Sequence, residues 1–128
     1  ILFINTNNLI TMEKLAEQIN DLNNLIAQGK ALEGFEKYYH DEVVMQENEN
    51  EPTIGKHTNR LRESEFFHAV TEFRKAQALN TSIGENVTMV LWHFDYTHKE
   101  WGERNYKQVS VQEWKDDKII RETFYYGS

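Results

Sequence analysis

The sequence predicts one α+β domain, with helices in the first half packed against a strongly curved, mixed or mainly antiparallel sheet. Two patterns predict this class. Apolar residues recur every three or four positions in the first half, whereas the second half is rich in valine, threonine and aromatic residues between turn signals. Helices followed by a meander of strands place the helices on one face of the sheet. A chain of 128 residues suffices for one core.

The first two helices follow from apolar spacing and from glycine stop signals. An amphipathic helix is expected over residues 12–28, with Thr11 as its N-cap and Gly29 at its end. A shorter helix is expected over residues 32–40, although Gly34 inside it weakens the pattern.

A third helix is expected after Gly55, with Thr58 or Asn59 as its N-cap. Residues 1–11 are expected to form a leader that can be mobile, so the domain is expected to span residues 12–128. The buried face expected for the third helix consists of Leu61, Phe66, Phe67, Val70 and Phe73.

Strands are expected from Val43, and then from about Arg74 to the end of the chain. Turn signals at residues 80–85, 97–102 and 116–117 divide this second half into long antiparallel strands. Because successive strand residues point to opposite faces, parity sorts each strand into two sets.

Parity gives the strand around residue 92 two partly apolar faces. One carries Val90, Trp92, Phe94 and Tyr96, and the other carries Met89, Leu91, His93 and Asp95. In the last strand, Ile120, Glu122, Phe124 and Tyr126 are expected opposite Ile119, Arg121, Thr123 and Tyr125. Helices cover one face only, so we expect a second copy of the chain to cover the outer face, giving a homodimer.

The composition narrows the classes of function. The net charge of −7 argues against binding to nucleic acid or to anionic membranes. Cysteine is absent, which excludes disulfides and thiolate chemistry. No export signal is recognisable, so we expect a cytoplasmic protein. We also expect that it uses no cofactor.

Several strings resemble the SnoaL-like group of the nuclear transport factor 2 superfamily. They are residues 35–44, where a helix leads into a strand, Gly55, residues 62–67, and residues 112–126, which resemble the closing hairpin of the family. This resemblance implies a cystatin-like cone in which three helices are wrapped by a bent sheet that encloses a pocket. Members include ketosteroid isomerases, polyketide cyclases and dehydratases. The closing turn departs from the pattern, since Asp117 stands where glycine is expected, and aspartate tolerates the left-handed backbone.

Three residues are candidate proton carriers. The ketosteroid isomerase-like resemblance implies a carboxylate base near Glu47, although Glu47 lies in an acidic, polar stretch typical of solvated loops. His93 and Asp95 share a strand face that is expected to look into the pocket, and a carboxylate beside a histidine raises its basicity. By parity, Gln108, Ser110, Gln112 and Glu122 are expected on the same face. The alternative is a hydrogen-bonded polar cluster or a solvated end of the sheet. The other expected ligand-binding residues are Tyr38, Gln108, Ser110, Gln112, Trp114, Glu122 and Phe124.

Two readings of function therefore remain open. The first is a dimeric domain that binds a small, partly apolar molecule and performs acid–base chemistry of the isomerase, cyclase or dehydratase type. The second is a non-catalytic dimeric interaction or accessory module whose core is filled. A metal site built on His93 and Asp95 is not expected, because His98 has the opposite strand parity.

Overall fold

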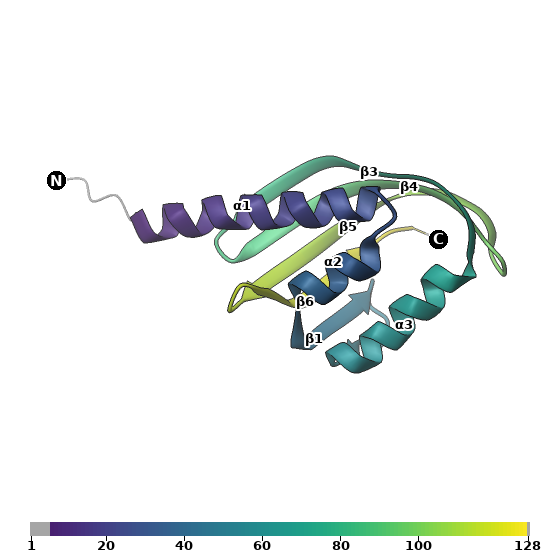
Figure 1. The fold of residues 1–128 in the computed structure, drawn as a ribbon, viewed down its shortest axis with the longest axis horizontal. Helices are drawn as coiled ribbons and strands as arrows, with labels where there is room; N and C mark the ends of the chain where they lie inside the picture. The colour runs from purple at the N-terminus through teal and green to yellow at the C-terminus, as the bar shows by residue number, and fades with distance from the viewer. Residues whose placement is uncertain (1–5, 128) are drawn as a thin grey trace.

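The computed structural model describes residues 6–127, and the side chains of residues 12–127. Three helices and six strands occupy this range (Figure 1). In chain order they are α1 (Thr6–Ala27), α2 (Ala31–Tyr38), β1 (Tyr39–Glu47), β2 (Thr53–Ile54), α3 (Lys56–Ala69), β3 (Val70–Gly84), β4 (Val87–His98), β5 (Gly102–Lys115) and β6 (Lys118–Tyr125). The predicted α+β class is confirmed.

The six strands form one mixed sheet in the order β2-β1-β6-β5-β4-β3. Only β1 and β6 run parallel, and the other neighbours are antiparallel. The long strands β3, β4 and β5 arch over the helices (Figure 1). Three register shifts along the β3–β4 ladder accompany this bend, since bulges increase local twist and curvature. The helices therefore lie on the concave side of the sheet.

Helix α1 begins at Thr6, inside the segment expected to be a leader, so Thr11 is an interior residue rather than an N-cap. The part of that leader formed by residues 1–5 lies outside the described residues. The predicted apolar stripe is buried, with Leu15, Ile19 and Leu22 at most 4% exposed. It packs into the same core as strand residues such as Trp92.

Helix α2 forms despite Gly34, and its packing explains why glycine occupies that position. A Cβ atom added at Gly34 would lie 2.7 Å from Leu22 Cδ1 of α1. The missing side chain thus lets α1 and α2 approach closely, which offsets the lower helix propensity of glycine.

Helix α3 begins directly after Gly55, which has a φ of 94°. The expected caps Thr58 and Asn59 are interior residues instead. Asn59 is fully buried, and its Nδ2 donates to the carbonyl oxygens of Val43, Thr53 and Gly55. This asparagine therefore ties the start of α3 to β1 and β2.

The expected buried face of α3 is partly wrong. Leu61 and Phe73 are exposed, and Phe66 and Phe67 are only half-buried. Asn59 and Ala69 are the residues of α3 that are buried. Phe66 and Phe67 border a cavity rather than a filled core, as described below, and Phe73 belongs to β3 instead of α3.

The closing turn between β5 and β6 behaves as expected. Lys115 pairs with Lys118, so the loop has two residues, Asp116 and Asp117, with φ values of 54° and 64°. Two-residue hairpin loops of this kind require a positive φ at both positions, which aspartate tolerates.

The even-numbered residues of β4 and β5 face the helices. Val90, Trp92 and Tyr96 are buried, and Trp92 pairs with the buried Gln108 of β5. The odd-numbered residues, which include His93, therefore lie on the outer face.

In β6 a bulge breaks strict parity. Trp114 pairs with Ile119 and Glu113 pairs with Arg121, so Ile120 is the extra residue. Ile119 is consequently fully buried on the inner face together with Glu122, contrary to the alternation that we expected. Among the described residues, no helix is long and apolar enough to cross a membrane.

Candidate functional site

A cavity of about 1030 Å³ lies between the helices and the inner face of the sheet. Its lining is mostly apolar and includes Trp92, Phe94 and Phe66. The polar groups of the lining include Tyr39 from β1, Glu63 from α3, Gln108 and Ser110 from β5, and Glu122 from β6. A largely apolar space with a few polar groups is the usual form of a small-molecule site.

Glu122 is the centre of a buried hydrogen-bond network. Its side chain is enclosed, with the residue only 3% exposed, and the Tyr39 hydroxyl donates to Oε1. Gln112 Nε2 donates to Oε2 at 2.7 Å. Gln112 Oε1 in turn accepts from the Thr88 hydroxyl at 2.7 Å, and Thr88 Oγ1 accepts from Trp114 Nε1 at 2.9 Å. Each member fixes the orientation of the next, so the carboxyl group is held in one position.

Burial gives Glu122 unusual acid–base behaviour. It raises the pKa of the carboxyl group from 4.5 to about 7, because the ionised form loses its solvation. The hydrogen bonds from Tyr39 and Gln112 favour the ionised form and lower the pKa, so they limit the shift. Burial also raises the pKa of Tyr39 well above its usual value, so Tyr39 stays protonated and remains a donor.

Glu63 is a second perturbed carboxyl group in the cavity. The residue is half-buried, and desolvation together with the charge of Glu122 raises its pKa from 4.5 to about 7, although Arg62 acts to lower it. Glu122 has two donors that favour its ionised form. When the two carboxyl groups together hold one proton, we therefore assign that proton to Glu63 and the negative charge to Glu122.

Aromatic side chains surround the end of the cavity formed by the β4–β5 hairpin. Phe66 meets Tyr96 edge to face, with ring centroids 5.5 Å apart, and Trp101 stacks on His98 at 3.8 Å. The hydroxyl groups of Tyr96 and Tyr106 are 2.9 Å apart. Burial raises the pKa of Tyr106, which keeps it neutral. This end therefore offers flat, uncharged surfaces to a ligand.

A family model for the SnoaL-like domain matches residues 10–126 of the chain. This chain belongs to the SnoaL-like domain family. No curated protein matches its sequence.

Solved structures extend the likeness to other proteins of the same fold. A candidate SnoaL-like polyketide cyclase from Mesorhizobium loti is 24% identical, with a TM-score of 0.79 over 88% of this chain and 98% of that one. An LEH-like epoxide hydrolase of M. tuberculosis is 8% identical, with a TM-score of 0.72 over 91% and 85%. A protein of unknown function from Xanthomonas campestris, described as having a cystatin-like fold, is 10% identical, with a TM-score of 0.76 over 90% of each chain. At these identities the likeness shows the fold alone, and it confirms the cone.

The predicted ligand-binding residues divide into two groups in this SnoaL-like domain. Four of these seven residues line the cavity: Gln108, Ser110, Glu122 and Phe124. The other three lie behind it. Tyr38 donates to Asp21 of α1, Gln112 supports Glu122, and Trp114 is bound to Thr88.

Glu47 lies at the cavity but is already engaged in an ion pair. Its Oε2 is 2.8 Å from Arg62 Nη2, and its side chain is 40% exposed. A solvated, paired carboxylate is a weaker candidate base than the enclosed carboxyl group of Glu122.

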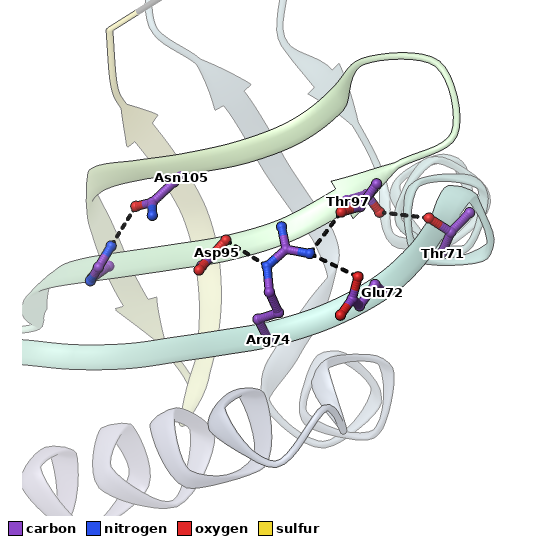
Figure 2. Close-up of polar contacts among 7 residues, drawn as sticks. Thr71, Glu72, Arg74, Asp95, Thr97 and Asn105 are labelled. Atoms are coloured by element: carbon purple, nitrogen blue, oxygen red, sulfur yellow. Dashed lines mark hydrogen bonds and ion pairs between the residues drawn. The ribbon is translucent and has the colours of Figure 1, made fainter.

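His93 and Asp95 do not face the helical layer, so that expectation is wrong. His93 Nε2 lies 2.6 Å from Asn105 Oδ1, and Asp95 accepts from Arg74 Nε at 2.9 Å. Figure 2 shows Arg74 reaching from β3 to Asp95 and Thr97 of β4, beside Asn105 of β5. Neither His93 nor Asp95 lines the cavity. The assumption that failed is the choice of face, since the buried face carries Trp92 and Tyr96.

Glu63 and Arg104 were not among the residues expected at the site, and Tyr39 was expected only as part of a helix. Glu63 lies in a helix rich in charged residues, so nothing in the pattern separated it from solvated neighbours. For Arg104, the even parity shared with Gln108 and Ser110 was the available signal. Within residues 12–127, no three His, Asp or Glu side chains cluster as metal ligands.

Proposed function

We propose that this SnoaL-like domain binds a small, partly apolar molecule in its cavity and moves protons on it with Glu122 and Glu63. The observation that carries this proposal is a pair of carboxyl groups, the buried Glu122 and the half-buried Glu63, that line one largely apolar cavity and each have a pKa of about 7. Perturbed carboxyl groups in a cleft favour general acid–base work near neutral pH. The reaction class is cofactor-independent isomerisation, cyclisation or dehydration.

The geometry supports a defined division of roles. Ionised Glu122 removes a proton from a carbon next to a carbonyl group, and the C–H electron pair moves toward the carbonyl oxygen. Protonated Glu63 donates its proton to that oxygen, so the enol forms without an isolated charge. Tyr39 stays protonated and holds Glu122 in place through their hydrogen bond. Return of a proton to the same or another carbon completes exchange or isomerisation.

Deuterium exchange tests this chemistry without knowledge of the natural substrate. The protein is incubated with tetralone in D2O, and the signal of the hydrogens beside the carbonyl is followed by NMR. We expect exchange above the buffer rate, and a loss of roughly 100-fold or more in Glu122→Gln, the size typical of a removed general base. Glu36→Gln is the control, because Glu36 pairs with Arg60 on the exposed surface. Exchange at the buffer rate in the native protein, or full activity in Glu122→Gln, contradicts the proposal.

The pH profile is a second test. If the pair works with one proton, the exchange rate is bell-shaped, with a maximum near the pKa of about 7 shared by Glu63 and Glu122. A rate that rises steadily with pH between about 5 and 9 argues for specific base catalysis by solvent instead.

The alternative of a non-catalytic module with a filled core receives less support. A cavity of about 1030 Å³ is not a filled core. Carboxyl groups that are withdrawn from water also cost stability, and a ligand site accounts for their presence whereas a filled core does not. Thermal-shift measurements with hydrophobic ketones distinguish the two, since a ligand specific for the folded state raises the melting temperature. If no ketone raises it and no exchange occurs, the module is the better account.

We also propose that two copies associate through the outer face of the sheet. Met89 pairs with Val111, and Leu91 pairs with Val109, which pairs with Tyr125. These five apolar side chains thus form one patch across three strands, and Met89 and Tyr125 are 45% and 50% exposed. A self-complementary sheet surface of this kind fits a second copy of the chain.

Sedimentation tests the dimer. Val109→Lys places a charge at the centre of the patch and is expected to yield monomer, whereas Ile54→Lys on the edge strand β2 is expected to leave the dimer intact. A native protein that is monomeric at high micromolar concentration rejects this association.

A further inference from the structure

Arg104 differs from the other arginines of the chain. The sequence contains five arginines, and all lie within residues 12–127. Four of them form ion pairs with carboxylates: Arg60 with Glu36, Arg62 with Glu47, Arg74 with Asp95, and Arg121 with Glu113. Arg104 forms no ion pair with any described residue, and its Nε is buried without a hydrogen-bond partner among them.

Arg104 belongs to the cavity. It pairs across the ladder with Tyr96, whose side chain is buried on the inner face, so both side chains point to the same side of the sheet. Arg104 is part of the cavity lining, and its Cζ lies 5.1 Å from the centroid of the Tyr106 ring. The guanidinium group is thus held against an aromatic face inside the cavity.

An unpaired guanidinium group at such a place is costly. A buried donor without a partner loses the hydrogen bonds that water gave it, and the cost is larger for a charged group. The chain has 21 acidic residues, yet none is placed against Arg104. The neighbouring Glu103 pairs with Thr97 and has the opposite parity, so it lies on the outer face. Arg104 is thus a cation in the cavity with no carboxylate beside it, which makes it a binding position for an anionic group of the ligand.

The surroundings of Arg104 indicate the rest of that ligand. Tyr106 and Tyr96 lie beside it, and Phe66 packs edge to face on Tyr96. Trp101 is 6.1 Å from Phe66 and completes an aromatic border. Flat rings pack well against such walls.

We propose that Arg104 binds the carboxylate of a planar, aromatic monocarboxylic acid, and that this acid is the substrate class of the cavity. The inference rests on the proposed function, because the far end of the same molecule would meet Glu63 and Glu122. A single unpaired guanidinium group neutralises one negative charge in a bidentate geometry. A phosphate monoester brings about two charges at neutral pH, which one arginine does not balance in a cavity that six glutamates also line.

The strand register also gives the ligand a direction and a length. Arg104 and Gln112 are on the same face of β5, and Gln112 contacts Glu122. At about 3.3 Å per residue, the backbone between these two positions spans roughly 26 Å. Because the two side chains point inward and the strand is bent, the distance between their polar groups is shorter than this. A molecule that reaches both ends is therefore elongated, with more than one ring or a ring and a chain.

Matched probes test the carboxylate site. Isothermal titration calorimetry compares naphthoate with naphthamide, its neutral counterpart, and with naphthyl phosphate. We expect the native protein to bind naphthoate roughly tenfold or more tightly than naphthamide, the size of one charge-assisted hydrogen-bonded contact. In Arg104→Met, which keeps an apolar stem over Tyr106, naphthoate is expected to fall to the affinity of naphthamide. Arg74→Met is the control, because Arg74 lies on the outer face and is paired with Asp95 (Figure 2).

Each outcome decides a different statement. Equal affinity of the native protein for naphthoate and naphthamide overturns the carboxylate site while leaving the proton transfer by Glu122 intact. Tighter binding of naphthyl phosphate overturns the choice of a monoanion. Preference for naphthoate that survives in Arg104→Met, or that disappears in Arg74→Met, overturns the assignment to Arg104. Failure of the native protein to bind any of the three contradicts the proposed function together with this inference. The first comparison uses the native protein alone, so it holds even if a variant fails to fold.

Discussion

Replacing Glu122 by glutamine changes how the stability of the protein depends on pH. The amide has the shape of the carboxyl group, so its oxygen can still accept from Gln112 Nε2 and its nitrogen can face the Tyr39 hydroxyl. The substitution thus removes one ionisation from the core while keeping its volume. The native protein and the variant differ mainly in whether position 122 can become charged.

The sign and the size follow from the raised pKa. The pKa of Glu122 rises from 4.5 to about 7 in the fold, so the folded protein holds the proton more tightly than the unfolded chain. The contribution of Glu122 to stability is complete at pH values below the pKa of the unfolded state. It is lost as the pH rises through the pKa of the folded state. Since one pKa unit corresponds to about 1.4 kcal/mol, the native protein loses about 3 kcal/mol across this window, a loss that Glu122→Gln does not share.

Denaturant unfolding at a series of pH values measures this difference. We expect the free energy of unfolding of Glu122→Gln, relative to that of the native protein, to rise by about 3 kcal/mol between about pH 5 and about pH 8.5. Glu36→Gln serves as the control. Hydrogen bonding to Arg60 lowers the pKa of Glu36, so its contribution is lost only in acid, and its curve is expected to stay parallel to the native curve in this window. Parallel curves for Glu122→Gln and the native protein would refute the reasoning.

Three further changes test other parts of the structure. Trp114→Phe removes the indole donor to Thr88 and is expected to lower the free energy of unfolding by about 1–3 kcal/mol in denaturant titrations; no loss would mean that this hydrogen bond contributes nothing. Gly55→Ala is expected to cost about 1–3 kcal/mol through backbone strain alone, because the φ is 94° and an added Cβ meets no atom within 4 Å; a neutral result in thermal unfolding would contradict the strained geometry. His93→Ala is expected to leave the melting shift caused by a bound ketone unchanged, and a lost shift would place His93 at the ligand.

The order of elements could be predicted from the sequence because local patterns determine it. The stripe of Leu15, Ile19 and Leu22 requires a helix with one buried face, and the two aspartates after Lys115 favour a tight hairpin. Helix ends were predicted less well. Thr11 and Thr58 are suitable caps by type, but the chain is helical through both, so residue type alone did not locate the helix starts.

The site was only partly predictable, because parity defines two faces without saying which one is inside. Gln108, Ser110 and Glu122 were expected on one face, and they do share it, but His93 and Asp95 lie on the other. The bulge at Ile120 also shifts β6 by one residue, which no local signal indicated.

The pairing of Glu63 with Glu122 could not be predicted at all. The two residues are far apart in the sequence, and the raised pKa of each depends on burial that only the assembled cone provides. Parity could place Arg104 on the inner face, but the lack of a carboxylate partner among the described residues is visible only in three dimensions.

The central claim is that the carboxyl groups of Glu122 and Glu63 change protonation near neutral pH, and NMR titration of 13C-labelled glutamate side chains observes them directly. We predict two carboxyl resonances with midpoints near the pKa of about 7, one of which disappears in Glu122→Gln while the other moves to lower pH. If every glutamate carboxyl group instead titrates near the ordinary value of about 4.3, the pair is solvated and the proposed chemistry is wrong.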